Sequence, residues 1–260
     1  MSGAEDKPGD KADDAKSPGK PVPVALPKRF YKEVTVGAGD GEYSILLDGR
    51  PVRTPAKRPL AVPTRALADA LAAEWAAQAE RIDPNSMPLS KLAITAIDGV
   101  AKHVADVAAE IVKFAGSDLL CYRAEAPEAL IALQAGAWDP ILDWARTKLG
   151  ARFRLGKGVV PVVQPKEALE RVAAAVAPFD AMALTALHVM TTLLGSAVLA
   201  LAHAKGRISA DEAWAAAHVD EDWQIAKWGV DFEAAERRAA RLREFEAASR
   251  FLALLGVRQG

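Results

Sequence analysis

The chain has 260 residues, of which 51% are hydrophobic and 26% are charged, a balance typical of a globular protein with a sizeable core. Its 33 basic and 34 acidic side chains give a net charge of −1, which argues against a general binder of nucleic acid or of anionic membranes. The single cysteine, Cys121, excludes internal disulfides and cysteine-rich zinc modules. The four histidines lack metal-binding spacing, so we expect no metal site.

Residues 1–27 differ in composition from the rest of the chain. They are rich in proline, lysine and acidic residues, and they contain no aromatic residue. Such a segment buries too little apolar surface to offset its chain entropy, so we predict a disordered tail. It has neither the apolar run of a secretory signal nor the arginines of a mitochondrial transit peptide. We therefore expect a bacterial, cytoplasmic protein.

Residues 28–88 are predicted to form a small β-rich N-terminal domain. Apolar and polar residues alternate at positions 34–36 and again at 43–47, with a glycine-rich turn between the two runs. Asp48-Gly49 then supplies a two-residue hairpin turn. This order predicts an antiparallel meander.

An amphipathic helix is expected to follow the meander. Thr64 is a suitable N-cap, and Asp83-Pro84 is expected to end the helix. The apolar stripe of this helix comprises Leu67, Leu71, Trp75, Gln78 and Ile82.

From residue 89 to residue 256 the hydrophobic period is that of helices, which predicts an all-α C-terminal domain and an α+β fold overall. A strand or a linker is expected at residues 159–163, and Ser209 with Glu212 forms a capping box. The predicted helices cover residues 89–115, 128–149, 166–176, 180–204, 210–228 and 231–255.

Residues 181–204 contain no charged side chain and are long enough to span a bilayer. Threonine, histidine and serine residues interrupt the segment, and alanine rather than leucine dominates it. We therefore interpret it as a helix buried at the centre of a bundle, without membrane insertion.

The motifs of common enzymes are incomplete in this chain. Gly156-Lys157-Gly158 lacks the spacing of a phosphate-binding loop, and Ser196 lacks the flanking glycines of a nucleophile elbow. Cys121 has no neighbouring histidine and is interpreted as a small buried hydrophobe. The sequence therefore predicts no enzyme of a familiar class.

The predicted helix 210–228 breaks the rule that one face is apolar and the other polar. Glu221 and Gln224 share a stripe with Trp214, Ala217, Ile225 and Trp228, whereas Trp223 lies on the polar side. This arrangement has three interpretations. Glu221 is a buried acid bonded to another helix, with Trp223 packed on the N-terminal domain, or the segment is a surface that meets a protein partner. The third interpretation is a metal or acid/base role for the three acids. The candidate partner-binding residues are Asp220, Glu221, Asp222, Trp223, Gln224 and Trp228.

A series of short motifs resembles, in order, the assembly chaperone family of the ATP synthase catalytic head. The resemblance covers residues 28–255. The motifs are Arg29-Phe30-Tyr31, Leu47-Asp48-Gly49-Arg50-Pro51 with Thr54-Pro55, Glu74-Trp75 with Gln78, Ile82-Asp83-Pro84 with Met87-Pro88, Asp118-Leu119-Leu120 with Tyr122, Trp138-Asp139-Pro140 with Trp144, and Asp220-Glu221-Asp222 with Gln224, Trp228-Gly229 and Asp231.

The resemblance implies a chaperone that binds the free α subunit of F1-ATPase, shields its β-contacting surface and is displaced when the catalytic head assembles. It implies no catalysis, no cofactor, and a location equivalent to the mitochondrial matrix of eukaryotic relatives. Since nothing in the sequence suggests an obligate oligomer, we expect a protein that is monomeric when free. It also implies that one acid among Asp220, Glu221 and Asp222 is essential, and the helix stripe favours Glu221. The alternative is a small-molecule enzyme that uses the acids at 220–222.

Overall fold

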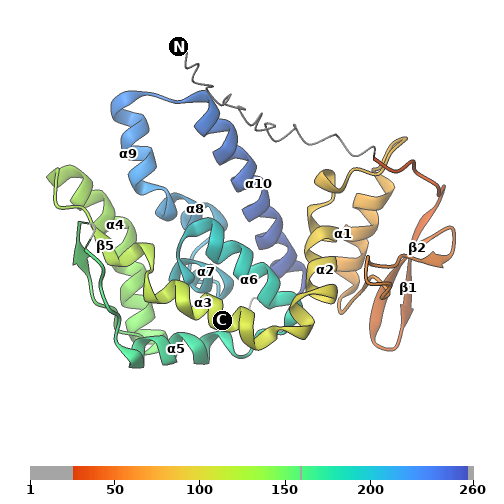
Figure 1. Cartoon of the computed structure of the whole chain (residues 1–260), viewed down its shortest axis with the longest axis horizontal. Coiled ribbons are helices and arrows are strands. Elements are labelled where there is room, and N and C mark those ends of the chain that lie inside the picture. Colours follow the sequence, from red (N-terminus) through yellow and green to blue (C-terminus); the bar gives the residue numbers. More distant parts are fainter. Residues whose placement is uncertain (1–25, 159, 257–260) are drawn as a thin grey trace, which may run out of the picture.

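The computed structural model describes residues 26–158 and 160–256, and it places a small sheet at one end of a larger helical body (Figure 1). The tail predicted over residues 1–27 lies outside the described residues except for Leu26 and Pro27. Their carbonyl groups accept hydrogen bonds from Arg81 (Nη1, 2.6 Å) and from the amide of Ile82 (2.9 Å). The chain therefore enters the fold along the segment that follows the first helix.

The N-terminal sheet is the predicted antiparallel meander. Its strands are β1 (Val34–Gly39), β2 (Glu42–Leu47), β3 (Arg50–Pro51) and β4 (Ala61–Val62). Strand β2 pairs with each of the others, and the β1–β2 register places Val36 opposite Ile45. Asp48 and Gly49 have φ values of +48° and +75°, as the two-residue hairpin turn requires. The Asp48 carboxylate also accepts a hydrogen bond from the Glu33 amide at 2.8 Å, which fixes the start of β1.

Helix α1 (Arg65–Ala76) begins at the predicted cap, where the Thr64 hydroxyl accepts a hydrogen bond from the Leu67 amide at 3.2 Å. The helix ends at Ala76, so the prediction that it continues to Asp83 is wrong. The physical reason lies in Gln78, which is buried and accepts a hydrogen bond from the Asp83 amide at 2.8 Å. This contact holds residues 78–83 in a loop that buries Ile82 without a helix.

The rest of the chain is mostly helical, which confirms the predicted α+β fold with a helical C-terminal part. Its helices are α2 (Pro88–Asp98), α3 (Val104–Gly116), α4 (Glu128–Trp144), α5 (Lys166–Val176), α6 (Ala181–Leu194), α7 (Ala197–Ala204), α8 (Ala210–Ala217), α9 (Val219–Trp228) and α10 (Phe232–Leu254). Short helical turns lie at η1 (Pro84–Ser86), η2 (Val100–Lys102), η3 (Leu119–Cys121) and η4 (Ala145–Leu149), and β5 (Tyr122–Arg123) pairs in parallel with β6 (Gly156–Lys157).

Three of the predicted long helices are each divided in two. The segment 89–115 breaks at residues 99–103, and 180–204 breaks where Gly195 adopts φ +65° and Ser196 caps α7. The segment 210–228 breaks at His218 (φ −116°). The described residues 160–163 form no strand, and the short strand β6 ends just before them. Hydrophobic period locates helical regions, whereas local capping decides where one helix stops.

Helices α6 and α7 form the centre of the body. Every residue of α7 is buried, and α6 packs against α2, α3, α7 and α10. This arrangement agrees with the buried-helix interpretation of residues 181–204. Within the described ranges, no helix combines the length and the apolar character that crossing a membrane would require.

Candidate partner-binding site

Helices α9 and α10 form an arm that rises from the helical body (Figure 1). We define the α9–α10 arm as residues 219–242. Gly229 lies between the two helices with φ +87°, a conformation that few other residues adopt, and the Asp231 carboxylate caps α10 by accepting a hydrogen bond from the Ala234 amide at 2.9 Å. The reversal of the chain at the tip of the arm is therefore set by local sequence.

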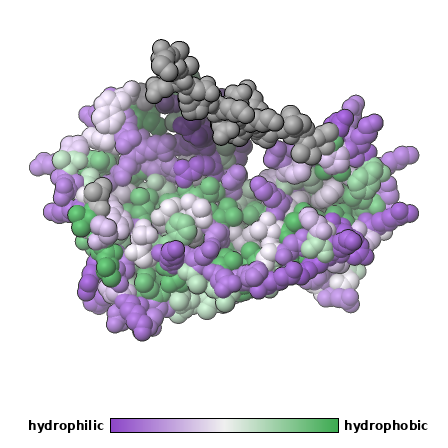
Figure 2. Space-filling view, viewed as in Figure 1, coloured by the Kyte–Doolittle hydropathy of each residue, from purple (hydrophilic) through white to green (hydrophobic). Residues whose placement is uncertain are grey.

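The arm exposes apolar side chains to an unusual extent. No residue of α9 is buried, and three large apolar residues at the tip are exposed: Trp228 by 78%, Val230 by 57% and Phe232 by 86%. The face of the molecule drawn in Figure 2 carries hydrophobic and hydrophilic residues side by side, with both kinds present in the arm at the upper left. Neighbouring exposed apolar residues of this kind mark a contact surface.

A groove of about 580 Å³ separates α9 from α10. Helix α9 rests on α4 and does not pack closely along α10. Large apolar side chains and small alanines make up most of the groove. It is lined by Trp214, Glu221, Gln224, Ile225, Trp228, Gly229, Val230, Asp231, Ala234, Ala235, Arg238, Ala239 and Leu242. The structure thus brings together Trp214, Glu221, Gln224, Ile225 and Trp228 of the predicted stripe, whereas Ala217 lies outside the groove lining.

The three consecutive acids of α9 have different surroundings. Asp220 accepts a hydrogen bond from the Gln134 side chain of α4 at 2.7 Å, and Asp222 pairs with Arg238 of α10 at 2.6 Å. The nearest basic group to Glu221 is Nε2 of His218, at 3.9 Å from its carboxylate. Glu221 is therefore the acid of this trio without a strong partner among the residues that the structure describes.

His218 offers Glu221 little positive charge. Its ring is buried and stacks on Trp214 with a centroid distance of 3.9 Å, and its Nδ1 donates a hydrogen bond to the Trp214 carbonyl at 2.8 Å. Burial lowers the pKa of His218 below its usual value, so its imidazole is mostly neutral near pH 7.

Trp223 lies on the opposite side of α9, as predicted. It lines a second cleft of about 370 Å³ together with Asp220 and residues of α4 and β5, and Lys227 lies over its ring at 5.0 Å. The alternative that Trp223 packs on the N-terminal domain is therefore wrong. The alternative that Glu221 accepts a bond from another helix is also wrong, because its nearest ion-pair contact is His218 at the start of the same helix.

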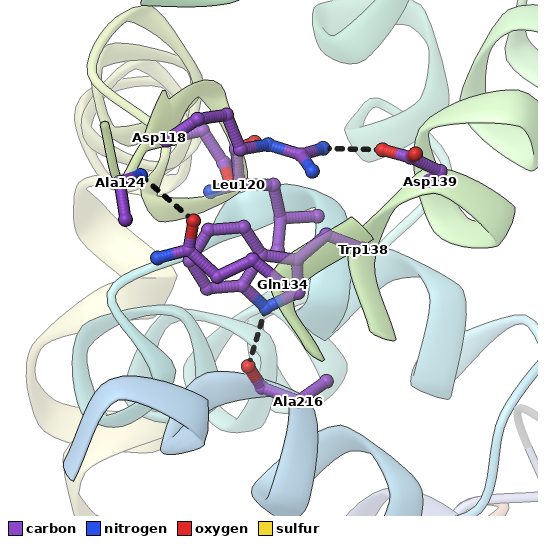
Figure 3. Close-up of polar contacts among 8 residues, drawn as sticks. Asp118, Leu120, Ala124, Gln134, Trp138, Asp139 and Ala216 are labelled. Carbon is purple, nitrogen blue, oxygen red and sulfur yellow. Dashed lines mark hydrogen bonds and ion pairs between the residues drawn. The ribbon is translucent and has the colours of Figure 1, made fainter. Parts of the chain in front are cut away.

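A set of polar contacts, from buried to exposed, holds α4 next to the arm (Figure 3). The indole Nε1 of Trp138 donates to the Ala216 carbonyl of α8 at 2.7 Å, and Gln134 accepts from the Ala124 amide at 2.8 Å. Arg123 pairs with Asp139 at 2.7 Å. Because Gln134 also donates to Asp220, the same side chain positions α9 on α4.

Sequence reasoning did not identify Gln134, Arg238, Val230 or Phe232 as parts of this region. The tip did carry a signal, since Trp228, Val230 and Phe232 surround the helix-ending Gly229 and have no amphipathic period of their own. Gln134 and Arg238 had no such signal, because their roles depend on contacts between helices that are distant in sequence.

The buried reactive groups elsewhere in the chain have structural roles. Cys121 is buried, and burial raises the pKa of its thiol to about 12, which leaves it protonated and unreactive near neutral pH. Asp118 accepts hydrogen bonds from Ser196 (2.6 Å) and the Val198 amide (3.1 Å) at the start of α7. Across the described ranges, no group of three or more His, Cys, Asp or Glu side chains is arranged to hold a metal ion.

Comparisons with known proteins agree with the sequence resemblance. Residues 28–146 match the family model described as ATP12 chaperone protein. Mitochondrial protein atp12 of Schizosaccharomyces pombe is 24% identical over 222 residues, which cover 80% of this chain and 76% of that protein.

Two solved structures are similar in both sequence and fold. Atp12 from Paracoccus denitrificans is 47% identical, with 88% of this chain and 98% of that chain covered and a TM-score of 0.84. The Atu1473 protein from Agrobacterium tumefaciens is 54% identical, with 88% and 87% covered and a TM-score of 0.85. The interpretation of the acids at 220–222 as part of a small-molecule enzyme is therefore wrong, and the chain belongs to the ATP12 family of F1-ATPase assembly chaperones, a family of non-enzymatic proteins.

Proposed function

We propose that this protein binds the free α subunit of F1-ATPase, shields the surface with which α contacts β, and is displaced when the catalytic head assembles. The observation that carries the proposal is the exposed apolar surface of the α9–α10 arm, with Trp228, Val230 and Phe232 at its tip. An unassembled subunit exposes apolar surface that it later buries against its neighbours, and such surface promotes aggregation. A chaperone needs a complementary apolar surface to cover it.

The proposed contact residues occupy both sides of α9. Glu221, Gln224 and Trp228 line the groove, and Asp220 and Trp223 line the cleft toward α4. Asp222 is paired with Arg238 between the two helices. A large exposed aromatic side chain beside partly paired charges is the composition expected of an energetic hot spot.

Displacement by β sets bounds on the affinity. An interface of standard size buries roughly 1,600 Å² in total. We expect a dissociation constant of about 10⁻⁶ to 10⁻⁸ M, because a complex near the picomolar limit would resist exchange. We further propose that the chaperone acts as a cytoplasmic monomer that neither binds nucleic acid nor inserts into the membrane.

The direct test is size-exclusion chromatography of the purified protein mixed with the isolated α subunit of its own ATP synthase, and separately with β. We expect co-elution with α and not with β, and release of the chaperone when β is added to the complex. Separate peaks in both mixtures would overturn the proposal.

A charge-reversal variant tests the site. Glu221→Lys is expected to abolish co-elution with α while the circular dichroism spectrum and the melting temperature stay close to those of the wild type, because Glu221 makes no strong internal contact. A marked drop in melting temperature would instead identify Glu221 as a structural acid.

A further inference from the structure

The two helices of the arm leave unusual space between them. Antiparallel helices joined by a short turn usually pack with their axes about 8–10 Å apart and bury their facing side chains. Here the facing sides of α9 and α10 are apolar and the helices remain apart, with a 580 Å³ groove between them. The arm thus has the geometry of a helix pair from which a third apolar element is missing.

The shape of the groove favours a helix as the missing element. Its α10 side is lined by Ala234, Ala235 and Ala239, whose small side chains allow the backbone of a neighbouring element to approach closely. Larger apolar side chains also line it, of which Ile225 and Trp228 lie on α9 and Leu242 on α10. Small side chains on one helix beside large apolar ones fit an amphipathic helix that lays its apolar face into the groove.

The charges around the groove indicate which kind of charged side chain the incoming helix carries. Asp222 is already paired with Arg238 at 2.6 Å, whereas Glu221 faces the groove with its side chain 37% exposed. The buried His218 ring, 3.9 Å from Glu221, is the nearest basic group that the described part of the chain places beside this carboxylate. A carboxylate in a mostly apolar groove is complementary to an arginine or lysine of the incoming segment, and arginine also stacks well on aromatic rings such as Trp228.

We propose that the α9–α10 groove binds an amphipathic helix of the partner, with apolar side chains spaced three and four residues apart against Trp214, Ile225, Trp228 and Leu242, and with a basic side chain that pairs with Glu221. This inference rests on the proposed function, because it takes the partner to be the α subunit. The inference adds to that function the secondary structure and the charge of the segment of the α subunit that is recognised.

The test uses the full-length protein and overlapping 20-residue peptides that cover the sequence of the α subunit. We expect binding by peptides that gain helical circular dichroism on mixing and that carry a basic residue within an apolar stripe. If all peptides that bind stay extended or lack a basic residue, the inference is overturned. The same holds if the intact α subunit binds and no peptide does.

Two substitutions that fill the groove from its α10 side sharpen the test. Ala235→Trp and Ala239→Trp are each expected to weaken peptide binding at least about tenfold, because the indole occupies the space of the helix. Arg237→Trp, on the same helix but outside the groove lining, is the matched control and should bind as the wild type does. Unchanged binding by both Ala235→Trp and Ala239→Trp would contradict the inference.

A charge swap tests the pairing. Glu221→Lys should weaken the best peptide at least about tenfold, and replacing the basic residue of that peptide by glutamate should restore affinity for the variant. Absence of rescue would overturn the assigned pairing. Failure of the intact α subunit to bind the wild-type protein would instead overturn the proposed function, so the two failures are distinguishable.

Discussion

The α6–α7 core and the α9–α10 arm differ in how much of their apolar surface is buried. Residues 181–204 in the core and the tip of the arm both carry large apolar side chains, yet all of α7 is buried and no residue of α9 is. Helix α6 of the core packs against α2, α3, α7 and α10. Helix α9, by contrast, packs closely against one of the described helices, α4. Apolar surface therefore stabilises the fold in one region and remains exposed to solvent in the other.

The two regions also treat their acids differently. In the core, the Asp118 carboxylate is fully buried and accepts hydrogen bonds from Ser196 and the amides of Leu120 and Val198. In the arm, Glu221 is partly exposed and has only a weak contact with His218. An acid with a complete set of internal donors is part of the fold, whereas one without them is available for binding.

The two regions are expected to differ most in how much a tryptophan contributes to the free energy of unfolding. Trp138→Ala removes a fully buried indole and leaves the Ala216 carbonyl without its donor, so we expect the free energy of unfolding to fall by about 3–5 kcal/mol. Urea denaturation followed by circular dichroism measures this loss. A change below about 1 kcal/mol would contradict the assignment of Trp138 to the core.

A leucine pair compares the same substitution inside and outside the core. Leu187→Ala, at a fully buried position in α6, should cost about 2–5 kcal/mol through lost burial and the cavity that remains. Leu133→Ala, at a position in α4 that is 51% exposed, is the matched control and should cost less than about 0.5 kcal/mol. Equal losses of unfolding free energy, measured by urea denaturation, would show that the two positions do not differ in their contribution to the core.

Asp118 predicts a pH dependence that belongs to the core. Burial raises the pKa of this carboxyl from 3.8 to about 6, so the folded protein holds its proton at pH values where the unfolded chain has lost it. The stabilising contribution of the protonated acid is fully present below about pH 4 and is lost as the pH rises through about 6.

The variant Asp118→Asn lacks this titration. Between pH 4 and pH 7 the wild type loses the contribution of Asp118 and the variant does not. We therefore expect the unfolding free energy of the variant minus that of the wild type to rise by about 3 kcal/mol over this range. Parallel denaturation series at several pH values measure the difference, and they cancel the titration of other groups. A flat difference would mean that the donors around Asp118 keep its carboxylate ionised throughout.

The smallest expected effect on stability is at the tip of the arm. Trp228→Ala should change the free energy of unfolding by less than about 0.5 kcal/mol, because the side chain is 78% exposed. The same variant should weaken binding of the α subunit at least about tenfold, as expected for an aromatic anchor. Stability and affinity measured on one preparation separate the two roles, and a variant that keeps full affinity would remove Trp228 from the proposed site.

Turns and helix caps, which depend on neighbouring residues, could be predicted from the sequence. The turn at Asp48-Gly49, the cap at Thr64 and the capping box of Ser209 and Glu212 each follow from short-range hydrogen bonding, and all are present. Hydrophobic period also placed residues 181–204 in the core and put Glu221 and Trp228 on one stripe, because side chains three and four residues apart share a helix face.

What the stripe of Glu221 and Trp228 faces could be established only from the tertiary structure. The groove between α9 and α10 depends on how these two helices and α4 are oriented, and no local pattern encodes the angles between their axes. The Gln134–Asp220 and Asp222–Arg238 contacts join residues from different helices, and they determine which acid stays without a strong partner. Such contacts form only when the whole chain has folded, and for this reason the sequence indicated the stripe but not the groove.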